Sequence, residues 1–174
     1  MVWKTTLRHL LFGAAPPEKP DAGLVKEMRA RLEDAAAQKL GRALNIRHVP
    51  AGSCNGCELE LRATQNLIYD LTQYGLSFVP SPRHADILLV TGVSSRNMAT
   101  ALREARAAMP DPAFVVAVGE CAVDGGVFKG SPVVAGGAEE LVAVDLLIPG
   151  CPPEPARIVE GLLALLEANE LPLG

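Results

Sequence analysis

The sequence predicts an α/β fold in which a parallel sheet carries helices on both faces. Three observations favour this class: continuously apolar runs alternate with segments of helical periodicity, Gly and Pro separate many of them, and the apolar content is aliphatic, with hydrophobic residues at 49% and aromatic residues at 4%. A strand that is apolar throughout is typical of a sheet buried on both sides. At 174 residues, we expect one domain with a short extension.

The extension occupies residues 1–44. Apolar side chains of its first dozen residues fall on one stripe of a helix, at Trp3, Leu7, Leu10 and Leu11. This helix either packs on the protein's own body or contacts a membrane surface or a membrane subunit, because basic residues stand beside the stripe. Residues 13–23 are rich in Pro and predict a linker. A second helix then places most of its apolar residues on one face, at Leu24, Met28, Leu32, Leu40 and Leu44.

The α/β domain occupies residues 45–174. We expect strands over 46–49, 76–79, 86–91, 113–118 and 142–148. Helices are expected over 58–74, from Ser94 or Ser95 to Met109, and over 154–167. Strands that alternate with helices in this way predict a doubly wound parallel sheet.

Composition argues against several classes of protein. The net charge of −4 and the pI of about 5.4 argue against a nucleic-acid partner, which requires a basic face. No apolar run is long enough to predict a transmembrane helix, and charged residues interrupt the amino-terminal segment, which is not typical of a signal peptide. We therefore expect a cytoplasmic chain. Its mean hydropathy of +0.21 suggests that part of its surface is buried against partner subunits.

Four cysteines carry the first functional signal. Each follows a predicted strand: Cys54 and Cys57 in SCNGC, Cys121 in VGECAVDGG, and Cys151 in IPGCPPEP. The carboxyl ends of parallel strands share one edge, where open α/β sheets bind ligands, so we expect all four to converge. Glycines near them would let the backbone approach a bulky inorganic ligand, at Gly52, Gly56, Gly119 and Gly150.

Four converging thiolates could hold an iron–sulfur cluster or a zinc ion. A cluster is favoured because only one C-x-x-C pair exists, the domain has its own core, and Cys151 precedes proline. A redox-active dithiol at Cys54 and Cys57 is a third interpretation, but it gives Cys121 and Cys151 no role.

Other polar residues near these motifs have weaker signals. Glu58, Glu60 and Glu120 could carry protons beside a redox centre, or could be ordinary acids at helix starts. Arg83 and His84 could face the cluster or a partner, or could be solvated loop residues. Gly125 and Gly126 could form an anion nest, but no phosphate-binding sequence follows them. No hydrolytic triad or dinucleotide fingerprint stands out.

Four motifs in order, GSCNGCELE, SPRHADILLVTG, VAVGECAVDGG and IPGCPP, carry a resemblance to a known family. Over about residues 45–168 the chain resembles the small subunit of membrane-bound, energy-conserving nickel–iron hydrogenases, the group that includes formate hydrogenlyase. That family is homologous to the 20 kDa subunit of respiratory complex I, an NADH-quinone oxidoreductase. The separation of Cys54 from Cys57 fits the hydrogenase-like branch, because complex I subunits have two adjacent cysteines here.

The resemblance implies a flavodoxin-like three-layer fold and one 4Fe-4S cluster, with Cys54, Cys57, Cys121 and Cys151 as its ligands. It implies a non-catalytic electron-transfer subunit that relays electrons between a catalytic large subunit, of nickel–iron or complex I-like type, and a ferredoxin-like iron–sulfur subunit. A membrane arm subunit is the third implied partner, and the expected location is peripheral, on the cytoplasmic side of the inner membrane. Two alternatives stay open: a subunit of NADH:quinone oxidoreductase type without hydrogenase activity, and a non-redox structural subunit with a zinc or vestigial site.

Overall fold

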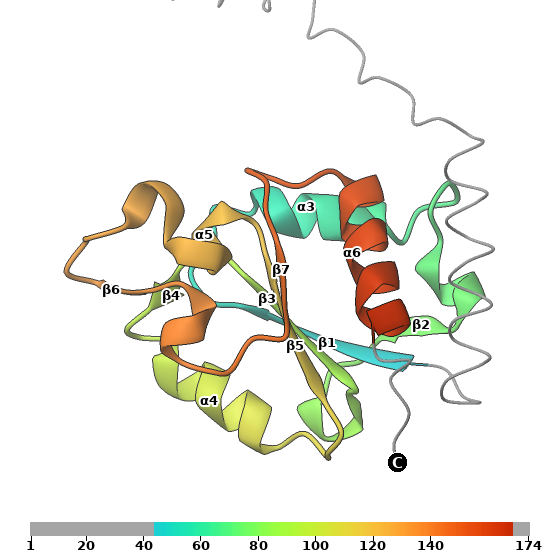
Figure 1. Cartoon of the computed structure of the whole chain (residues 1–174), viewed down its shortest axis with the longest axis horizontal. Helices are drawn as coiled ribbons and strands as arrows, with labels where there is room; N and C mark the ends of the chain where they lie inside the picture. Colours follow the sequence, from blue (N-terminus) through green and yellow to red (C-terminus); the bar gives the residue numbers. More distant parts are fainter. Residues whose placement is uncertain (1–43, 169–174) are drawn as a thin grey trace, which may run out of the picture.

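Five parallel strands form the central sheet of the computed structural model, which describes residues 44–168 (Figure 1). The strands are β1 (Leu44–Pro50), β2 (Leu76–Phe78), β3 (Ile87–Thr91), β5 (Phe114–Val118) and β7 (Leu146–Ile148). They lie in the order β2-β1-β3-β5-β7, and every neighbouring pair is parallel. Strand β3 is buried at each of its positions, as its continuous apolar run predicts.

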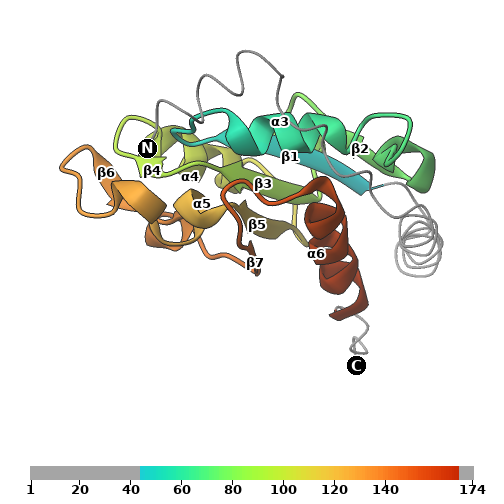
Figure 2. The ribbon, with the colours of Figure 1, turned by 90° about the horizontal axis from the view of Figure 1, so that it is seen from above.

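Helices cover both faces of this sheet. On one face lie α3 (Gly56–Ala63) and α6 (Pro155–Ala168), which contribute Leu61 and Leu162 to one buried cluster. On the other face, α4 (Ala99–Ala107) and α5 (Glu120–Asp124) contribute Leu102 and Ala122 to a second. Figure 1 shows α3 and α6 on the opposite side of the sheet from α4, and Figure 2 shows α3 lying along β1. This three-layer α/β arrangement confirms the predicted fold class.

Shorter elements lie in the segments that connect the main strands and helices. A two-stranded antiparallel sheet joins β4 (Ser94–Ser95) to β6 (Val134–Gly136). Four short 3₁₀ helices complete the described residues: η1 (Leu71–Tyr74), η2 (Pro82–His84), η3 (Gly126–Phe128) and η4 (Ala138–Glu140). Among residues 44–168, no helix combines the length and the apolar character needed to cross a membrane.

The helix expected over 58–74 is wrong in its length, because α3 ends at Ala63. The side chain of Asn66 accepts hydrogen bonds from the backbone N–H groups of Ile68 and Tyr69, at 2.8 and 3.1 Å, and closes a turn instead. Thr64 also turns its hydroxyl back to the carbonyl of Leu61, at 2.7 Å. Side chains of this kind compete with helical hydrogen bonds, and here they end the helix.

The expected boundaries of two strands are also wrong. Leu44, which we placed on a helix, begins β1 and donates from its backbone to the carbonyl of Gly75 at 2.6 Å. The strand expected over 142–148 begins only at Leu146. Just before it, the carboxylate of Asp145 accepts a hydrogen bond from the N–H of Val115 on β5, at 2.7 Å, in place of a backbone carbonyl. The amphipathic helix, the linker and most of the second helix of the extension lie outside the described residues.

The sequence suggested that a helix starts at Ser94 or Ser95, and this expectation is wrong. They form β4, and α4 begins only at Ala99. Ser95 donates from its backbone N–H to the carbonyl of Ala51 at 3.1 Å, so this segment follows the loop after β1 before it turns into the helix.

Candidate functional site

The loops that follow β1, β5 and β7 meet at the carboxyl edge of the sheet. They bring Cys54, Cys57, Cys121 and Cys151 around one cavity of about 160 Å³. Half of the other residues that line it are glycines, and Pro152 and Phe128 are among the rest. This convergence of residues almost a hundred positions apart follows from the parallel topology, as the sequence predicts.

Glycine at position 119 lets two of these loops approach each other. Gly119 has a φ of +92°, and a Cβ there would lie 2.5 Å from the sulfur of Cys57. Its N–H donates to the carbonyl of Ile148 at 2.8 Å, and the N–H of Glu120 donates to the carbonyl of Gly150 at 2.9 Å. The segment that carries Cys121 is therefore tied to the segment that leads into Cys151.

The end of β3 supports the loop that carries the first cysteine pair. Gly92 has a φ of +75°, and a Cβ there would lie 2.6 Å from the Cα and the backbone N of Ser53. Immediately before it, the carbonyl of Thr91 accepts from the N–H of Ala51 at 2.8 Å. Only glycine allows this close backbone contact.

Two of the cysteines, Cys57 and Cys121, lie in surroundings that disfavour their thiolates. Burial, and then Glu58 and the three other cysteines, raise the pKa of Cys57 to about 11. Burial, and then Cys151 and Cys54, also raise the pKa of Cys121. These thiols are therefore protonated at neutral pH in the protein alone, and a bound group must supply positive charge to hold them as thiolates.

The four cysteines around the cavity are candidate ligands for an inorganic group. Among the described residues, no three Cys, His, Asp or Glu side chains lie close enough to share a single metal ion. The cysteines instead surround a cavity that has room for several atoms. A soft donor set of four thiols is able to hold an iron–sulfur cluster or a zinc ion.

The three candidate acids lie in different surroundings. Glu120 lines the cysteine cavity. Glu58 turns toward β1 and β3, where it accepts a short hydrogen bond from the hydroxyl of Thr91 and lies 3.9 Å from the Nε2 of His48. The negative charge of Glu60 lies near Tyr69: burial raises the pKa of Tyr69 most, and the charges of Glu154 and Glu60 raise it further. Of the three acids, only Glu120 lines the cavity directly.

Two further motifs lie away from the cavity or are satisfied internally. Arg83 and His84 belong to η2, which directly precedes β3 and therefore lies toward the amino ends of the strands, away from the cysteines. The turn at Gly125 and Gly126 does not need an external anion, because the carboxylate of Asp124 accepts from the N–H of Gly126 at 2.9 Å.

Sequence reasoning missed three residues of this region. Phe128 comes from η3 and lines the cavity, and nothing in its local sequence indicates that position. Thr91 and His48 reach Glu58 from two strands. Thr91 left a signal, since it is a polar residue at the end of a strand that is otherwise apolar.

The fold and site define a parallel α/β domain with four cysteines at the carboxyl edge of its sheet, where such folds bind their ligands. Residues 54–165 match the family described as NADH ubiquinone oxidoreductase, 20 Kd subunit. The chain belongs to this family.

Relatives with curated names extend this finding. Formate hydrogenlyase subunit 7 of Escherichia coli is 41% identical over 146 residues, which are 82% of this chain and 57% of the relative, so the chain spans little more than half of that protein. A probable membrane-bound hydrogenase subunit of Pyrococcus furiosus is 41% identical over 80% of this chain and 85% of its own length. An NADH-quinone oxidoreductase subunit of Flavobacterium johnsoniae is 41% identical, covering 88% and 81%.

Solved structures agree on the fold. A chain of the archaeal membrane-bound sulfane sulfur reductase matches with a TM-score of 0.64 and 28% identity, covering 80% of this chain and 77% of that one. A chain of an NAD⁺-reducing [NiFe]-hydrogenase matches with a TM-score of 0.58 at 23% identity, covering 76% and 96%, and this likeness concerns the fold alone. These proteins are named as subunits or chains of oxidoreductases, and two of them are named as membrane-bound.

Proposed function

We propose that this chain is the electron-transfer subunit of a membrane-bound oxidoreductase complex and holds one 4Fe-4S cluster on Cys54, Cys57, Cys121 and Cys151. The observation that carries the proposal is that these four cysteines, from the segments that follow three separate strands, line one cavity of about 160 Å³. Membership of the 20 kDa subunit family supports it.

The chain's own groups then have defined roles. The four sulfurs hold the group, and the backbone N–H groups of the glycine-rich loops are available as donors to its sulfur atoms. When bound, such a cluster accepts and releases one electron at a time. Half-burial of Cys57 and Cys121, and the Glu120 carboxylate at the cavity, tune the potential at which it does so.

The surroundings of the cavity support a catalytic partner that covers it. Cys54 and Cys151 are exposed, and three large apolar side chains stand out from the neighbouring η3–β6 segment: Val127, Phe128 and Val133. We call these three residues the η3–β6 patch. Exposed apolar groups beside a redox centre are typical of a surface that is covered in an assembly. We therefore propose a catalytic large subunit on this face, with a ferredoxin-like iron–sulfur subunit and a membrane arm subunit completing a peripheral assembly on the cytoplasmic side of the inner membrane.

The catalytic metal or substrate site belongs to the partner on this proposal. The chain has four cysteines, and the cluster uses all of them. The two residues between Cys54 and Cys57 favour a partner of nickel–iron type over one of the NADH:quinone type. The partner's own sequence distinguishes these, because a nickel–iron subunit carries two C-x-x-C pairs of its own.

The test is a count of iron and acid-labile sulfide on anaerobically purified chain, with an EPR spectrum after dithionite reduction. About four of each per chain, with a reduced-cluster signal that Cys121→Ala abolishes, is the expected result. One zinc and no sulfide, on protein kept free of oxygen, would overturn the proposal in favour of a structural metal site.

A further inference from the structure

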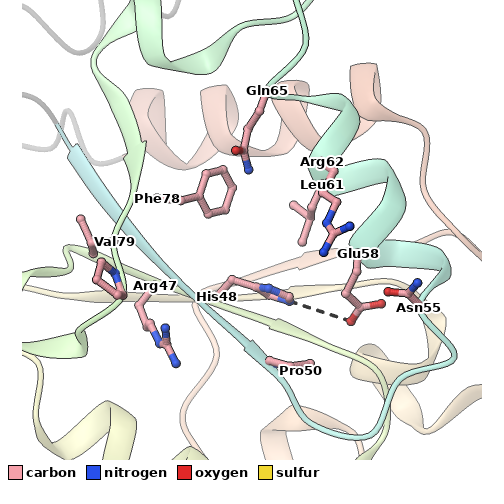
Figure 3. Close-up of a pocket in the computed structure, with 11 residues that line it drawn as sticks. Arg47, His48, Pro50, Asn55, Glu58, Leu61, Arg62, Gln65, Phe78 and Val79 are labelled. Atoms are coloured by element: carbon pink, nitrogen blue, oxygen red, sulfur yellow. Dashed lines mark ion pairs between the residues drawn. The ribbon is translucent and has the colours of Figure 1, made fainter.

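A partly buried hydrogen-bond chain connects two strands of the sheet to the helix that carries Cys57. The hydroxyl of Thr91, at the end of β3, donates to the Oε1 of Glu58 in the first turn of α3. The Nε2 of His48, on β1, lies 2.9 Å from the same hydroxyl oxygen. Figure 3 shows the His48 ring and the Glu58 carboxylate pointing toward each other from β1 and α3.

The direction of these hydrogen bonds follows from the donor count. A hydroxyl has one proton, and Thr91 gives it to the carboxylate, so its oxygen must accept from the His48 ring. His48 therefore carries its proton on Nε2. Burial lowers the pKa of His48 more than the nearby Glu58 raises it, which favours the neutral imidazole in this orientation.

The start of α3 lacks the support that a helix usually has. Its N-cap residue, Asn55, has a φ of 74° and makes no side-chain capping bond. Glu58, in the first turn, instead attaches the start of α3 to β3 through its hydrogen bond from Thr91. Burial acts to raise the pKa of Glu58, but the Thr91 and Ser53 side chains, as hydrogen-bond donors, help to lower it overall.

Burial leaves Glu58 dependent on these contacts. Its second oxygen, Oε2, is buried and has no partner among the described residues, so the carboxylate is held through Oε1. Thr91 itself is fully buried in a strand whose other side chains are apolar. A hydroxyl in that position is costly unless it both donates and accepts a hydrogen bond, which is the arrangement seen.

We propose that Thr91 and His48 are positioning residues of the cluster site: through Glu58 they fix the first turn of α3, and with it Cys57 and the Cys54 loop, against β1 and β3. This inference rests on the proposed function, because it concerns the geometry of the proposed ligands. Neither residue lines the cysteine cavity, so their influence on a cluster passes through Glu58.

Thr91→Val tests the proposal, with Thr91→Ser as its matched control. Valine keeps the shape of threonine but removes the hydroxyl, whereas serine keeps the hydroxyl. In the anaerobically purified chain we expect Thr91→Val to lose iron to a chelator several-fold faster than the wild type, with changed EPR g-values and a shifted midpoint potential. Thr91→Ser should restore wild-type values of all three.

A second variant keeps the test decisive if Thr91→Val does not fold. His48 is partly exposed at the rim of a groove between α3 and β2, so His48→Leu should fold and should change the same spectrum and potential, less strongly. Wild-type EPR spectrum, potential and iron release in a folded Thr91→Val would overturn the inference, and if Thr91→Val does not fold, the same result in His48→Leu would overturn it. Absence of iron and sulfide from the wild-type chain would instead overturn the proposed function.

Discussion

At the residue scale, the cysteine cavity depends on positions where no side chain can be accommodated. Gly119 and Gly92 both have positive φ, and a Cβ at either would come within 2.6 Å of an atom in the loop that carries Cys54 and Cys57. Such positions tolerate only glycine, because both the backbone conformation and the space exclude other residues. The glycines are thus part of the site as much as the cysteines are.

Gly119→Ala should leave the chain folded but remove most of its iron. The added Cβ would displace the sulfur of Cys57, which lies 2.5 Å away. Gly130→Ala is the matched control, because Gly130 also has a positive φ, of +84°, but has nothing within 4 Å of the added atom. Iron and sulfide counts on both variants check the prediction, and equal losses would attribute the effect to backbone strain alone.

The reactivity of Cys57 should depend on pH in a way that differs between the folded and unfolded chain. Burial, the neighbouring Glu58 and the three other cysteines raise its pKa to about 11 in the cluster-free fold. At pH 8 the folded chain should therefore hold on the order of a hundredfold less Cys57 thiolate than the urea-unfolded chain, whose thiol titrates near its ordinary value. Alkylation rates of Cys57, followed by mass spectrometry across neutral to alkaline pH, measure this. Equal rates in both states at pH 8 would contradict it.

At the scale of the elements, the apolar periodicity of the carboxyl-terminal segment places its helix correctly. The expected helix over 154–167 corresponds to α6, which buries Ile158 and Leu162 against the sheet. The helix expected over 58–74 fails because periodicity does not detect a competing polar side chain. Asn66 closes its turn with a local hydrogen bond while the apolar pattern continues past it.

Leu162→Ala should destabilise the domain by about 2–5 kcal/mol, because it removes a fully buried side chain and leaves a cavity under α6. Glu160→Ala, at an exposed position of the same helix, should change the free energy of unfolding by less than about 0.5 kcal/mol. Urea denaturation followed by circular dichroism compares the two. Similar losses in both variants would mean that α6 is not packed on the core as described.

At the scale of the whole molecule, the exposed apolar residues gather unevenly. The η3–β6 patch lies beside the cysteine cavity, which Phe128 lines directly. A different exposed pair, Leu67 and Ile68, lies in the turn after the other end of α3. The high hydropathy of the sequence therefore reflects surface, in part, and not only the core.

Val127→Asp should weaken retention of the catalytic subunit on the tagged chain, because a charge would be buried without a partner in the proposed interface. Leu67→Asp is the control, since Leu67 is as exposed as Val127, at 92% against 84%, but does not adjoin the cavity. Tagged chains isolated from their host, with the catalytic subunit quantified by mass spectrometry, give the comparison. Equal retention in both variants would remove the η3–β6 patch from the interface.

Patterns along the chain are sufficient to establish the fold class and the convergence of the four cysteines. Both follow from the order of elements, because parallel strands joined by helices must end at one edge, wherever their loops lie in the chain. The motifs around Cys54, Cys57, Cys121 and Cys151 also identify the family. These patterns are visible in this one sequence, so both features are predictable before the structure is known.

The surroundings of those cysteines, in contrast, emerge only from tertiary packing. That Glu58 turns to His48 and Thr91, and that Phe128 reaches the cavity, depends on contacts between elements far apart in the sequence. The physical reason is that each side chain's direction is set by the packing of α3 and the loops on the sheet, which balances many small contacts. The helix and strand propensities of short segments do not contain information about that packing.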